Sequence, residues 1–318
     1  MSLFEKIKRI FFMNKFQTLS EGFNSEDIIN LAKKEKNPEK ILEILNNKVT
    51  QLQSAEIAQI ISMLPNNYRI QGIEIGQKYI TPYDLYDLAL KKLDSTGKIE
   101  VLEKFQTRLD LEDIFQLFNN LPPDKRVTAL NKCIERFESY SLSEVIQKYI
   151  PLYERLNCLN LYKNKLDASS KSLIIGTLDT KRKILALQQY NQEINKTDLY
   201  NIVCETEQNK ISEVLDVVSN KLTSQQISDI IQYHIPENQR LTSLYKCCYR
   251  LEGSKISDLI KFSIPEEQKE EALIALQNRM KSNNIGEIIQ FCVRSKKALD
   301  KVKHNLDPED VEFFKNSI

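Results

Sequence analysis

Basic side chains are the residues of this sequence whose type and spacing most clearly suggest binding chemistry. One lysine or arginine recurs in each of ten successive segments at intervals of 27 to 30 residues, although only 45 of the 318 residues are basic. We call these ten residues the basic ridge: Lys40, Arg69, Lys98, Arg126, Arg155, Lys183, Lys210, Arg240, Lys269 and Lys297. Cations at a regular interval can follow the phosphates of a polyanion or face an acidic protein partner. Alternatively, they bind the free carbonyls at helix C-termini and have a structural role.

Two further charge columns recur at a similar interval. The second column is basic and contains Lys48, Arg108, Arg136, Lys165, Lys221, Arg250 and Arg279. The third column is acidic and contains Asp87, Asp113, Glu144, Asp229, Asp258 and Glu287. Cations near the end of one helix and acids near the start of another suit the dipoles of both helices. We therefore predict an ion-pair ladder between these two columns and assign both of them a structural role.

Residues that could carry catalysis or hold a metal are sparse and scattered. The sequence contains no GxxxxGK[ST], GxGxxG, GxSxG or HExxH motif. Its two histidines, His234 and His304, are far apart, and its six cysteines form no CxxC pair. We therefore expect no enzyme activity, no catalytic residue, no metal site and no cofactor. The cysteines are interpreted as buried free thiols, with a redox role as the alternative.

The elements that carry these columns are the helices of a repeat. The pattern apolar-x-x-apolar-apolar marks one face of a short helix, helix A, and it occurs ten times with a mean period between 28 and 29 residues. Its copies begin at Ile28, Ile57, Leu85, Leu111, Leu142, Ser170, Leu199, Ile227, Ile256 and Ile285. A second helix, helix B, follows each copy, often after an apolar residue and a proline such as Leu64-Pro65. The basic ridge opens helix B.

Neither short helix can bury its apolar stripe alone, so neighbouring hairpins must stack into one continuous core. We predict an all-α fold, a right-handed α-solenoid (superhelix) of about ten two-helix repeats of 28–29 residues with atypical end caps. The low content of glycine (7) and proline (9) agrees, because strand-rich folds use glycine freely in turns. The predicted parts are an N-terminal amphipathic capping helix at 1–24, the helical repeat solenoid at 25–306 and a C-terminal half-repeat cap at 307–318.

The overall charge is balanced, with 45 basic and 44 acidic residues and a net charge of +1. This balance excludes a uniformly basic nucleic-acid-binding protein. No stretch approaches the roughly 20 apolar residues that span a bilayer, and the N-terminal segment does not fit a secretory signal. We therefore expect a cytoplasmic protein. The segment from Phe4 to Phe16 is basic and amphipathic, and it either covers the open end of the solenoid or touches an anionic membrane surface.

One repeat resembles those of the TAL-effector-like DNA-binding solenoids. The matching residues are Thr81-Pro82-Tyr83-Asp84-Leu85-Tyr86-Asp87-Leu88-Ala89, followed by Gly97-Lys98. In that family the equivalent lysine contacts DNA phosphate, so the resemblance implies that Lys98 and the rest of the basic ridge are phosphate contacts. The repeat length and the prolines are also similar to those of the mitochondrial transcription-termination-factor family. The C-terminal Glu309-Asp310-Val311-Glu312 resembles the glutamate-rich end of secreted bacterial effectors, which implies a location in a host cytosol or nucleus.

These observations predict a non-enzymatic scaffold that binds a macromolecular partner through its concave face and the edge that carries the basic ridge. A protein is the first candidate for the partner, because helical repeats without a dedicated code for bases more often bind proteins and the net charge is near neutral. The alternative is TAL-effector-like nucleic-acid binding with one phosphate-contacting Lys or Arg per repeat. The protein is expected to be a monomer.

Overall fold

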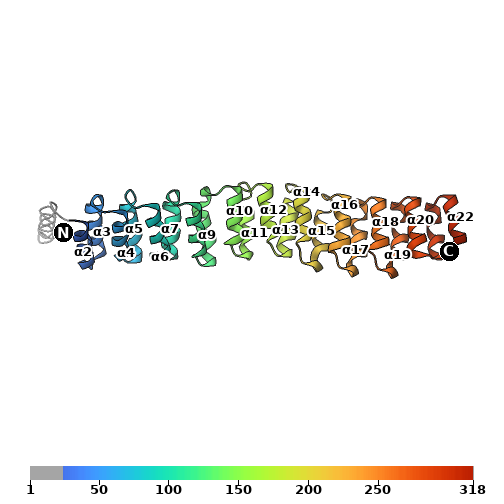
Figure 1. The fold of residues 1–318 in the computed structure, drawn as a ribbon, viewed down its shortest axis with the longest axis horizontal. Coiled ribbons are helices and arrows are strands. Elements are labelled where there is room, and N and C mark those ends of the chain that lie inside the picture. Colours follow the sequence, from blue (N-terminus) through green and yellow to red (C-terminus); the bar gives the residue numbers. More distant parts are fainter. Residues whose placement is uncertain (1–23, 318) are drawn as a thin grey trace. The chain divides into compact units, whose positions relative to one another are not determined.

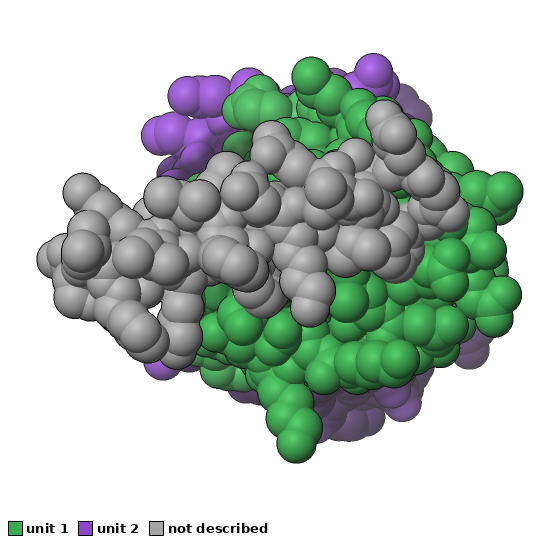
Figure 2. Space-filling model, turned by 90° about the vertical axis from the view of Figure 1, so that its left-hand side faces the viewer, with its two compact units in different colours: residues 1–137 green, residues 138–318 purple. Residues whose placement is uncertain are grey.

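A computed structural model describes residues 24–317 of the chain, and every regular element within this range is a helix. The prediction of an all-helical fold is therefore confirmed for the described residues. The chain divides into two compact units, residues 1–137 and residues 138–318, which are coloured green and purple in Figure 2. Apart from Asn24, the N-terminal capping helix predicted at 1–24 lies outside the described residues.

The first unit alternates two sets of helices, which correspond to helix A and helix B of the sequence repeat. Its A helices are α2 (Ser25–Lys34), α4 (Ser54–Met63), α6 (Pro82–Lys92) and α8 (Leu111–Asn119). Its B helices are α3 (Pro38–Lys48), α5 (Asn66–Gly76), α7 (Ser95–Lys104) and α9 (Pro123–Cys133). Short 3-10 turns follow three of the B helices, at η1 (Val49–Gln51), η2 (Gln106–Arg108) and η3 (Ile134–Arg136).

The second unit continues the alternation. Its A helices are α10 (Ser139–Lys148), α12 (Ala168–Gly176), α14 (Lys196–Cys204), α16 (Ser224–Asp229), α18 (Gly253–Phe262), α20 (Ser282–Ile288) and α22 (Pro308–Ser317). Its B helices are α11 (Leu152–Leu161), α13 (Thr180–Tyr190), α15 (Ile211–Val218), α17 (Glu237–Cys247), α19 (Glu266–Leu276) and α21 (Lys296–Val302). Its 3-10 turns are η4 (Gln208–Lys210), η6 (Cys248–Arg250), η7 (Gln277–Arg279) and η9 (Lys303–Asn305). The π-helical turns η5 (Ile230–His234) and η8 (Ile289–Val293) continue α16 and α20.

Within each unit, helices that are two apart in the sequence pack against one another (Figure 1). In the first unit α4 contacts α2 and α6, while α5 contacts α3 and α7. In the second unit α18 contacts α16 and α20, while α17 contacts α15 and α19. The last helix, α22, occupies the segment predicted as a C-terminal cap and packs on α20 and α21. The A helices therefore form one layer of each unit and the B helices form the other.

The core lies between these two layers and consists of the apolar stripes that define the repeat. In α4, for example, Ile57, Ile60 and Ile61 have no exposed surface. Such complete burial stabilises each hairpin by roughly 1.5–3 kcal/mol per large aliphatic side chain. Thr81 and Thr223 are the N-caps of α6 and α16, and their side chains accept hydrogen bonds from backbone N–H groups of the first turn.

The predicted position of the repeat pattern is wrong in two A helices. In α8 the buried residues are Ile114, Leu117 and Phe118, whereas Leu111 is 37% exposed. Leu111 directly follows the N-cap Asp110, so it belongs to the first turn and faces outward. In α12 the pattern starts one residue later than predicted, at the buried Lys171, and Leu173 is 42% exposed. With the stripes beginning at Ile114 and Lys171, every step of the repeat is 28 or 29 residues.

Candidate binding surface

The structure places seven residues of the basic ridge at equivalent positions of their B helices. Each of them stands four residues before a fully buried Leu or Ile; they are Arg69, Lys98, Arg126, Arg155, Lys183, Arg240 and Lys269. Lys40 and Lys210 stand five residues before the corresponding leucine, and Lys297 stands two before it. The buried Ile41 and Ile211 occupy the equivalent position in the repeats of Lys40 and Lys210. The regular ridge predicted for all ten repeats is therefore out of register in three of them.

The arginines of the basic ridge bind the ends of the A helices that precede them. The Nε atom of Arg126 donates a hydrogen bond to the carbonyl oxygen of Leu121 at 3.0 Å. Arg155 and Arg240 make the same contact with the carbonyl oxygens of Ile150 at 3.1 Å and Ile235 at 3.0 Å. Each acceptor immediately precedes a proline, which has no N–H group to donate. These guanidinium groups therefore satisfy carbonyls at the A-to-B turn.

Three ridge residues also reach the next A helix along the chain. Arg240 Nη1 donates to the carbonyl oxygen of Ser263 at 3.1 Å, and Arg69 donates to the carbonyl oxygen of Lys92. Lys183 is only 3% exposed, and its Nζ atom donates to Thr206 Oγ1 at 3.4 Å. Burial lowers the pKa of Lys183, and the neighbouring Glu205 and Glu207 oppose that shift. All three contacts join residues 23 positions apart, so they connect one repeat with the next.

The other ridge lysines have mostly local partners. Lys210 and Lys269 pair with Glu213 and Glu266, both at 2.6 Å, within the first turns of their helices. The exposed Lys40 and Lys297 approach acids at the longer distances of 3.9 and 4.0 Å. Lys98 is half-buried, and its side chain has no hydrogen-bond or ion-pair partner among residues 24–317.

The predicted ladder between the second and third charge columns is wrong for the residues whose contacts are resolved. Arg108 binds the carbonyl oxygens of Gln77 and Ile80, and Arg136 Nη2 donates to that of Leu109 at 3.0 Å. These acceptors end the B segment of the preceding repeat. The acidic column pairs instead with lysines of the A helices, as in Asp87–Lys91 and Glu144–Lys148, each at 2.5 Å.

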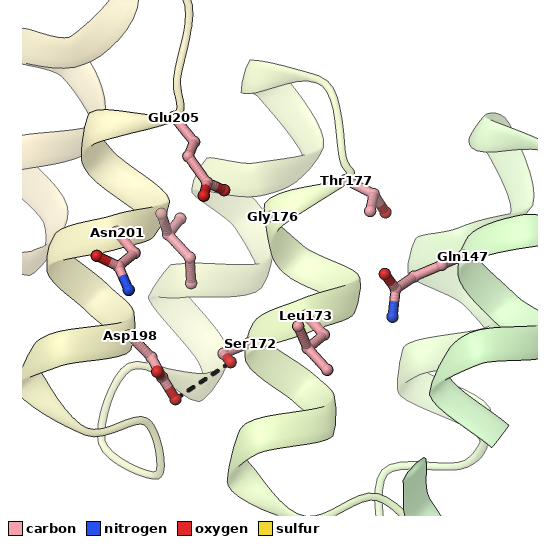
Figure 3. Close-up of a pocket in the computed structure, with 9 residues that line it drawn as sticks. Gln147, Ser172, Leu173, Gly176, Thr177, Asp198, Asn201 and Glu205 are labelled. Carbon is pink, nitrogen blue, oxygen red and sulfur yellow. Dashed lines mark hydrogen bonds between the residues drawn. The ribbon is translucent and has the colours of Figure 1, made fainter. Parts of the chain in front are cut away.

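A shallow pocket opens on the A layer of the second unit, where α10, α12 and α14 lie side by side (Figure 3). Its volume is about 280 Å³, and its lining residues are Gln147, Ser172, Leu173, Gly176, Thr177, Asp198, Asn201, Ile202 and Glu205. Ser172 Oγ donates to Asp198 Oδ2 at 3.2 Å, which holds that carboxylate against α12. Gly176 leaves space beside Glu205, since a Cβ atom at Gly176 would lie 3.7 Å from Glu205 Oε2. The pocket thus combines carboxylate, amide and hydroxyl groups with one exposed leucine.

A row of exposed aromatic side chains lies on the same layer of the second unit. Tyr233 in η5, Phe262 in α18 and Phe291 in η8 are 68%, 72% and 65% exposed. Each residue stands six positions after the first buried residue of its apolar stripe, so the three are equivalent in successive repeats. We call them the aromatic row. Two of its members lie in π-helical turns, a distortion that is frequent at functional sites.

An acid stands four residues before each member of the aromatic row, on the same face of its helix. The pairs are Asp229–Tyr233, Asp258–Phe262 and Glu287–Phe291. Lys261 lies between two of these acids, with its Nζ atom 3.2 Å from Asp258 and 2.7 Å from Glu287. The same ammonium group is 5.2 Å from the centre of the Phe262 ring, within the range of a cation–π contact.

The aromatic row is not among the predicted features, because the charge columns and the apolar stripes do not include these three positions. The signal is present in the sequence as acid-x-x-x-aromatic, which occurs at Asp229, Asp258 and Glu287 in steps of 29 residues. The sequence does not show that the aromatic side chains point into solvent, because a helix of this size can bury residues on more than one face. Burial in the folded chain decides that point.

Metal-ligating side chains are not clustered in the described part of the chain. No group of three or more His, Cys, Asp or Glu side chains between residues 24 and 317 is arranged to hold a metal ion. The six cysteines are free, and burial raises the pKa of Cys133, Cys158 and Cys247 to about 12. These three thiols therefore remain protonated at neutral pH. None of the helices described in this range has both the length and the apolar character of a membrane span.

Comparison with known proteins assigns the chain to no group. No protein-family model, no curated protein and no solved structure matches it.

Proposed function

We propose that this chain is a non-enzymatic helical-repeat scaffold that binds a protein partner. In this proposal the stacked hairpins continue as a right-handed α-solenoid of about ten two-helix repeats. The protein is a monomer in the cytoplasm, or in a host cytosol or nucleus if it is a secreted effector. In this proposal the binding surface is the A layer of the second unit, with the aromatic row and the pocket of Figure 3, instead of the predicted concave face and basic edge.

The observation that carries the proposal is the exposure of Tyr233, Phe262 and Phe291. Large apolar side chains scattered singly over a surface need no explanation, but a group of them at equivalent positions marks an interaction site. Aromatic residues are also enriched where protein interfaces concentrate their binding energy. None of the three contributes to the core, so the repeat has no structural need for an aromatic side chain at this position.

The contacts of the basic ridge favour a structural role over phosphate binding. Arg126, Arg155 and Arg240 already donate to carbonyl oxygens, and Lys183 is buried. A phosphate would have to displace these bonds before it could use the same donors. TAL-effector-like binding with one phosphate contact per repeat therefore has less support than protein binding, and it becomes an outcome of the test below.

The test uses the full chain with a photo-crosslinking amino acid in place of Phe262. A matched chain carries the crosslinker in place of Tyr83, which is equally exposed at 72% and lies on an A helix of the first unit. We expect a discrete protein adduct in cells from position 262 and a weaker one, or none, from position 83. In parallel, labelled DNA and RNA are titrated at about 50 mM salt, where binding to a polyanion is strong. Salt-sensitive nucleic-acid binding without a protein adduct would overturn the proposal.

A further inference from the structure

We infer that the aromatic row and its three acids bind a protein segment that carries basic and large apolar side chains. This inference rests on the proposed function and specifies the chemistry of the partner. The segment would lie along η5, α18 and η8 of the second unit. Its apolar side chains would contact Tyr233, Phe262 and Phe291, and its cations would face Asp229, Asp258 and Glu287.

The first argument is a contrast among equivalent positions of the repeat. In two other A helices, α6 and α10, the acid at this position is followed four residues later by a lysine that pairs with it, at Asp87–Lys91 and Glu144–Lys148. In the repeats of the aromatic row, an aromatic residue stands where that lysine would be. Asp229, Asp258 and Glu287 therefore lack a lysine four residues later in their own helix turn, and an exposed aromatic side chain takes its place.

The second argument is the balance of charge around the aromatic row. Asp229, Asp258 and Glu287 supply three carboxylates, whereas Lys261 supplies one ammonium group, shared between Asp258 and Glu287. Asp229 accepts a hydrogen bond from the neutral Gln225 at 2.7 Å. Two negative charges therefore remain uncompensated within the group. A cationic partner gains from these charges and also from cation–π contact with the exposed rings.

The third argument is the continuity of this surface with the pocket of Figure 3. Two pocket residues, Glu205 of α14 and Thr177 of α12, stand at the position equivalent to Tyr233. Two others, Asn201 of α14 and Leu173 of α12, stand at the position equivalent to Asp229. Both groups of residues lie on the A layer of the second unit. A segment that leaves the aromatic row toward α12 would thus meet a further carboxylate, polar groups and one exposed leucine.

The spacing of the row favours a polypeptide segment over a small cation. Packed helices lie about 8–10 Å apart, so two steps of the repeat extend over roughly 16–20 Å. An extended chain covers this distance in about six residues. A single small ligand can contact one acid–aromatic pair, but a peptide can contact all three.

The inference is tested by selecting random peptides of about a dozen residues on phage against the full chain. We expect the selected peptides to be enriched in Lys or Arg together with Leu, Ile or aromatic residues. The best of them is then synthesised with a fluorescent label, and its dissociation constant is measured by anisotropy. A second version has Glu in place of each basic residue, and we expect it to bind about ten-fold or more weakly.

The key variant is the double substitution Phe262→Lys and Phe291→Lys. It recreates the acid–lysine pairs seen at Asp87–Lys91 and Glu144–Lys148, so we expect the chain to fold normally. We expect this variant to bind the peptide about ten-fold or more weakly. The control is Leu161→Lys, which also adds a cation at an exposed apolar residue of the second unit, but on a B helix. We expect this control to bind like the unmodified chain.

Each other outcome has a defined meaning. Selection of acidic peptides, or peptide binding that the double variant leaves intact, would overturn the inference. If the crosslinking experiment still gave a protein adduct, the proposed function would stand and the partner would have a different chemistry. Loss of both the adduct and all peptide binding would reject the proposed function itself. Circular dichroism of each variant shows whether a loss of binding reflects unfolding.

Discussion

At the scale of single residues, the repeat uses arginine and lysine for different tasks at one position. A guanidinium group has five donors in a planar fork, whereas an ammonium group is a compact charge on a flexible stem. The fork allows Arg240 to bind Ile235 and Ser263 at the same time. Lys269, at the equivalent position of the following repeat, pairs with Glu266 instead. Arg240 thus joins two successive A helices, whereas Lys269 makes only a local contact.

The first prediction concerns this double contact of Arg240. We expect Arg240→Ala to lower the free energy of unfolding by about 1–3 kcal/mol, because it leaves two partly buried carbonyls without donors. Arg240→Lys should recover little of this loss, since lysine cannot reproduce both bonds. Urea denaturation followed by circular dichroism measures the change. Lys297→Ala serves as the control, because its side chain is 75% exposed and lies 4.0 Å from its acid. Equal effects of Arg240→Ala and Lys297→Ala would contradict the structural role.

The second prediction concerns Lys171, a charge at a core position where other repeats have Ile or Leu. Its side chain is 8% exposed, pairs with Glu193 and lies 5.5 Å from the ring centre of Tyr190. We expect Glu193→Ala to lower the urea midpoint, because the buried ammonium group loses its counter-ion. Lys171→Leu should leave the midpoint unchanged or raise it, since it restores the apolar stripe and Glu193 remains half-exposed. A midpoint for Lys171→Leu below that of Glu193→Ala would show that the ion pair stabilises the fold.

The third prediction compares two neighbouring thiols. Burial raises the pKa of Cys247 to about 12, whereas Cys248 is only partly buried. The thiolate is the reactive form, and a raised pKa keeps the thiol protonated until the pH approaches that value. At about pH 8 we therefore expect iodoacetamide to modify Cys248 well before Cys247, as measured by mass spectrometry of digested protein. Denaturation in urea before labelling should abolish the difference. Equal labelling of the native protein would mean that α17 opens readily.

At the scale of elements, close helix contacts depend on small residues at a few points. Gly253 begins α18, and a Cβ atom there would lie 2.7 Å from the carbonyl oxygen of Arg279 and 3.2 Å from Cα of Met280. Backbone atoms cannot move aside as a flexible side chain can. The absence of a side chain at Gly253 therefore allows α18 to approach the end of η7.

The fourth prediction tests this contact with a matched pair of glycines. We expect Gly253→Ala to lower the free energy of unfolding by about 1–3 kcal/mol through overpacking. Gly176→Ala, at the end of α12, should instead raise it by about 0.5–1 kcal/mol, because alanine is the better helix former and the nearest atom is 3.7 Å away. Thermal unfolding of both variants measures whether each substitution lowers or raises the stability of the chain. If Gly253→Ala raised the stability instead, α18 and the end of η7 could move apart without a loss of free energy.

At the scale of the whole molecule, half of the basic ridge contributes contacts within the fold. Arg69, Lys183 and Arg240 connect successive repeats, and Arg126 and Arg155 bind carbonyl oxygens at the turn between their A and B helices. Solenoid stability is the sum of repeat and interface terms, so breaking several of these contacts at once affects folding more than it affects surface charge. Arg126, Arg155 and Lys183 are all partly or fully buried.

The fifth prediction follows from this role. We expect the combined change of Lys98, Arg126, Arg155 and Lys183 to Glu to reduce the helical circular dichroism signal and the melting temperature strongly, because it buries unpaired acids. The combined change of Lys40, Lys210 and Lys297 to Glu should leave both nearly unchanged, because these side chains are 44%, 42% and 75% exposed. If the first variant remained fully helical and lost only polyanion binding, the ridge would be a nucleic-acid surface after all.

The sequence by itself determined that the part of the chain described by the structure, residues 24–317, is all-helical and built from alternating A and B helices. Periodic apolar residues such as Ile57, Ile60 and Ile61 define a helix face locally, and a period of 28–29 residues repeats that information many times. The register was wrong at Leu111, which follows the N-cap Asp110 and competes with Ile114 for the first apolar position. It was also wrong at Ser170, because the first core position of that repeat is occupied by the charged Lys171.

Only the tertiary structure decided what the recurring side chains contact. Arg240 and Ser263 lie 23 residues apart, and nothing in the local sequence shows that a guanidinium group will reach that carbonyl. The same holds for the exposure of Phe262, because a residue is exposed or buried according to the helices that pack around it. Spacing along the chain assigns a residue to a face of its helix, and the packing of neighbouring repeats decides whether that face meets carbonyls, core or solvent.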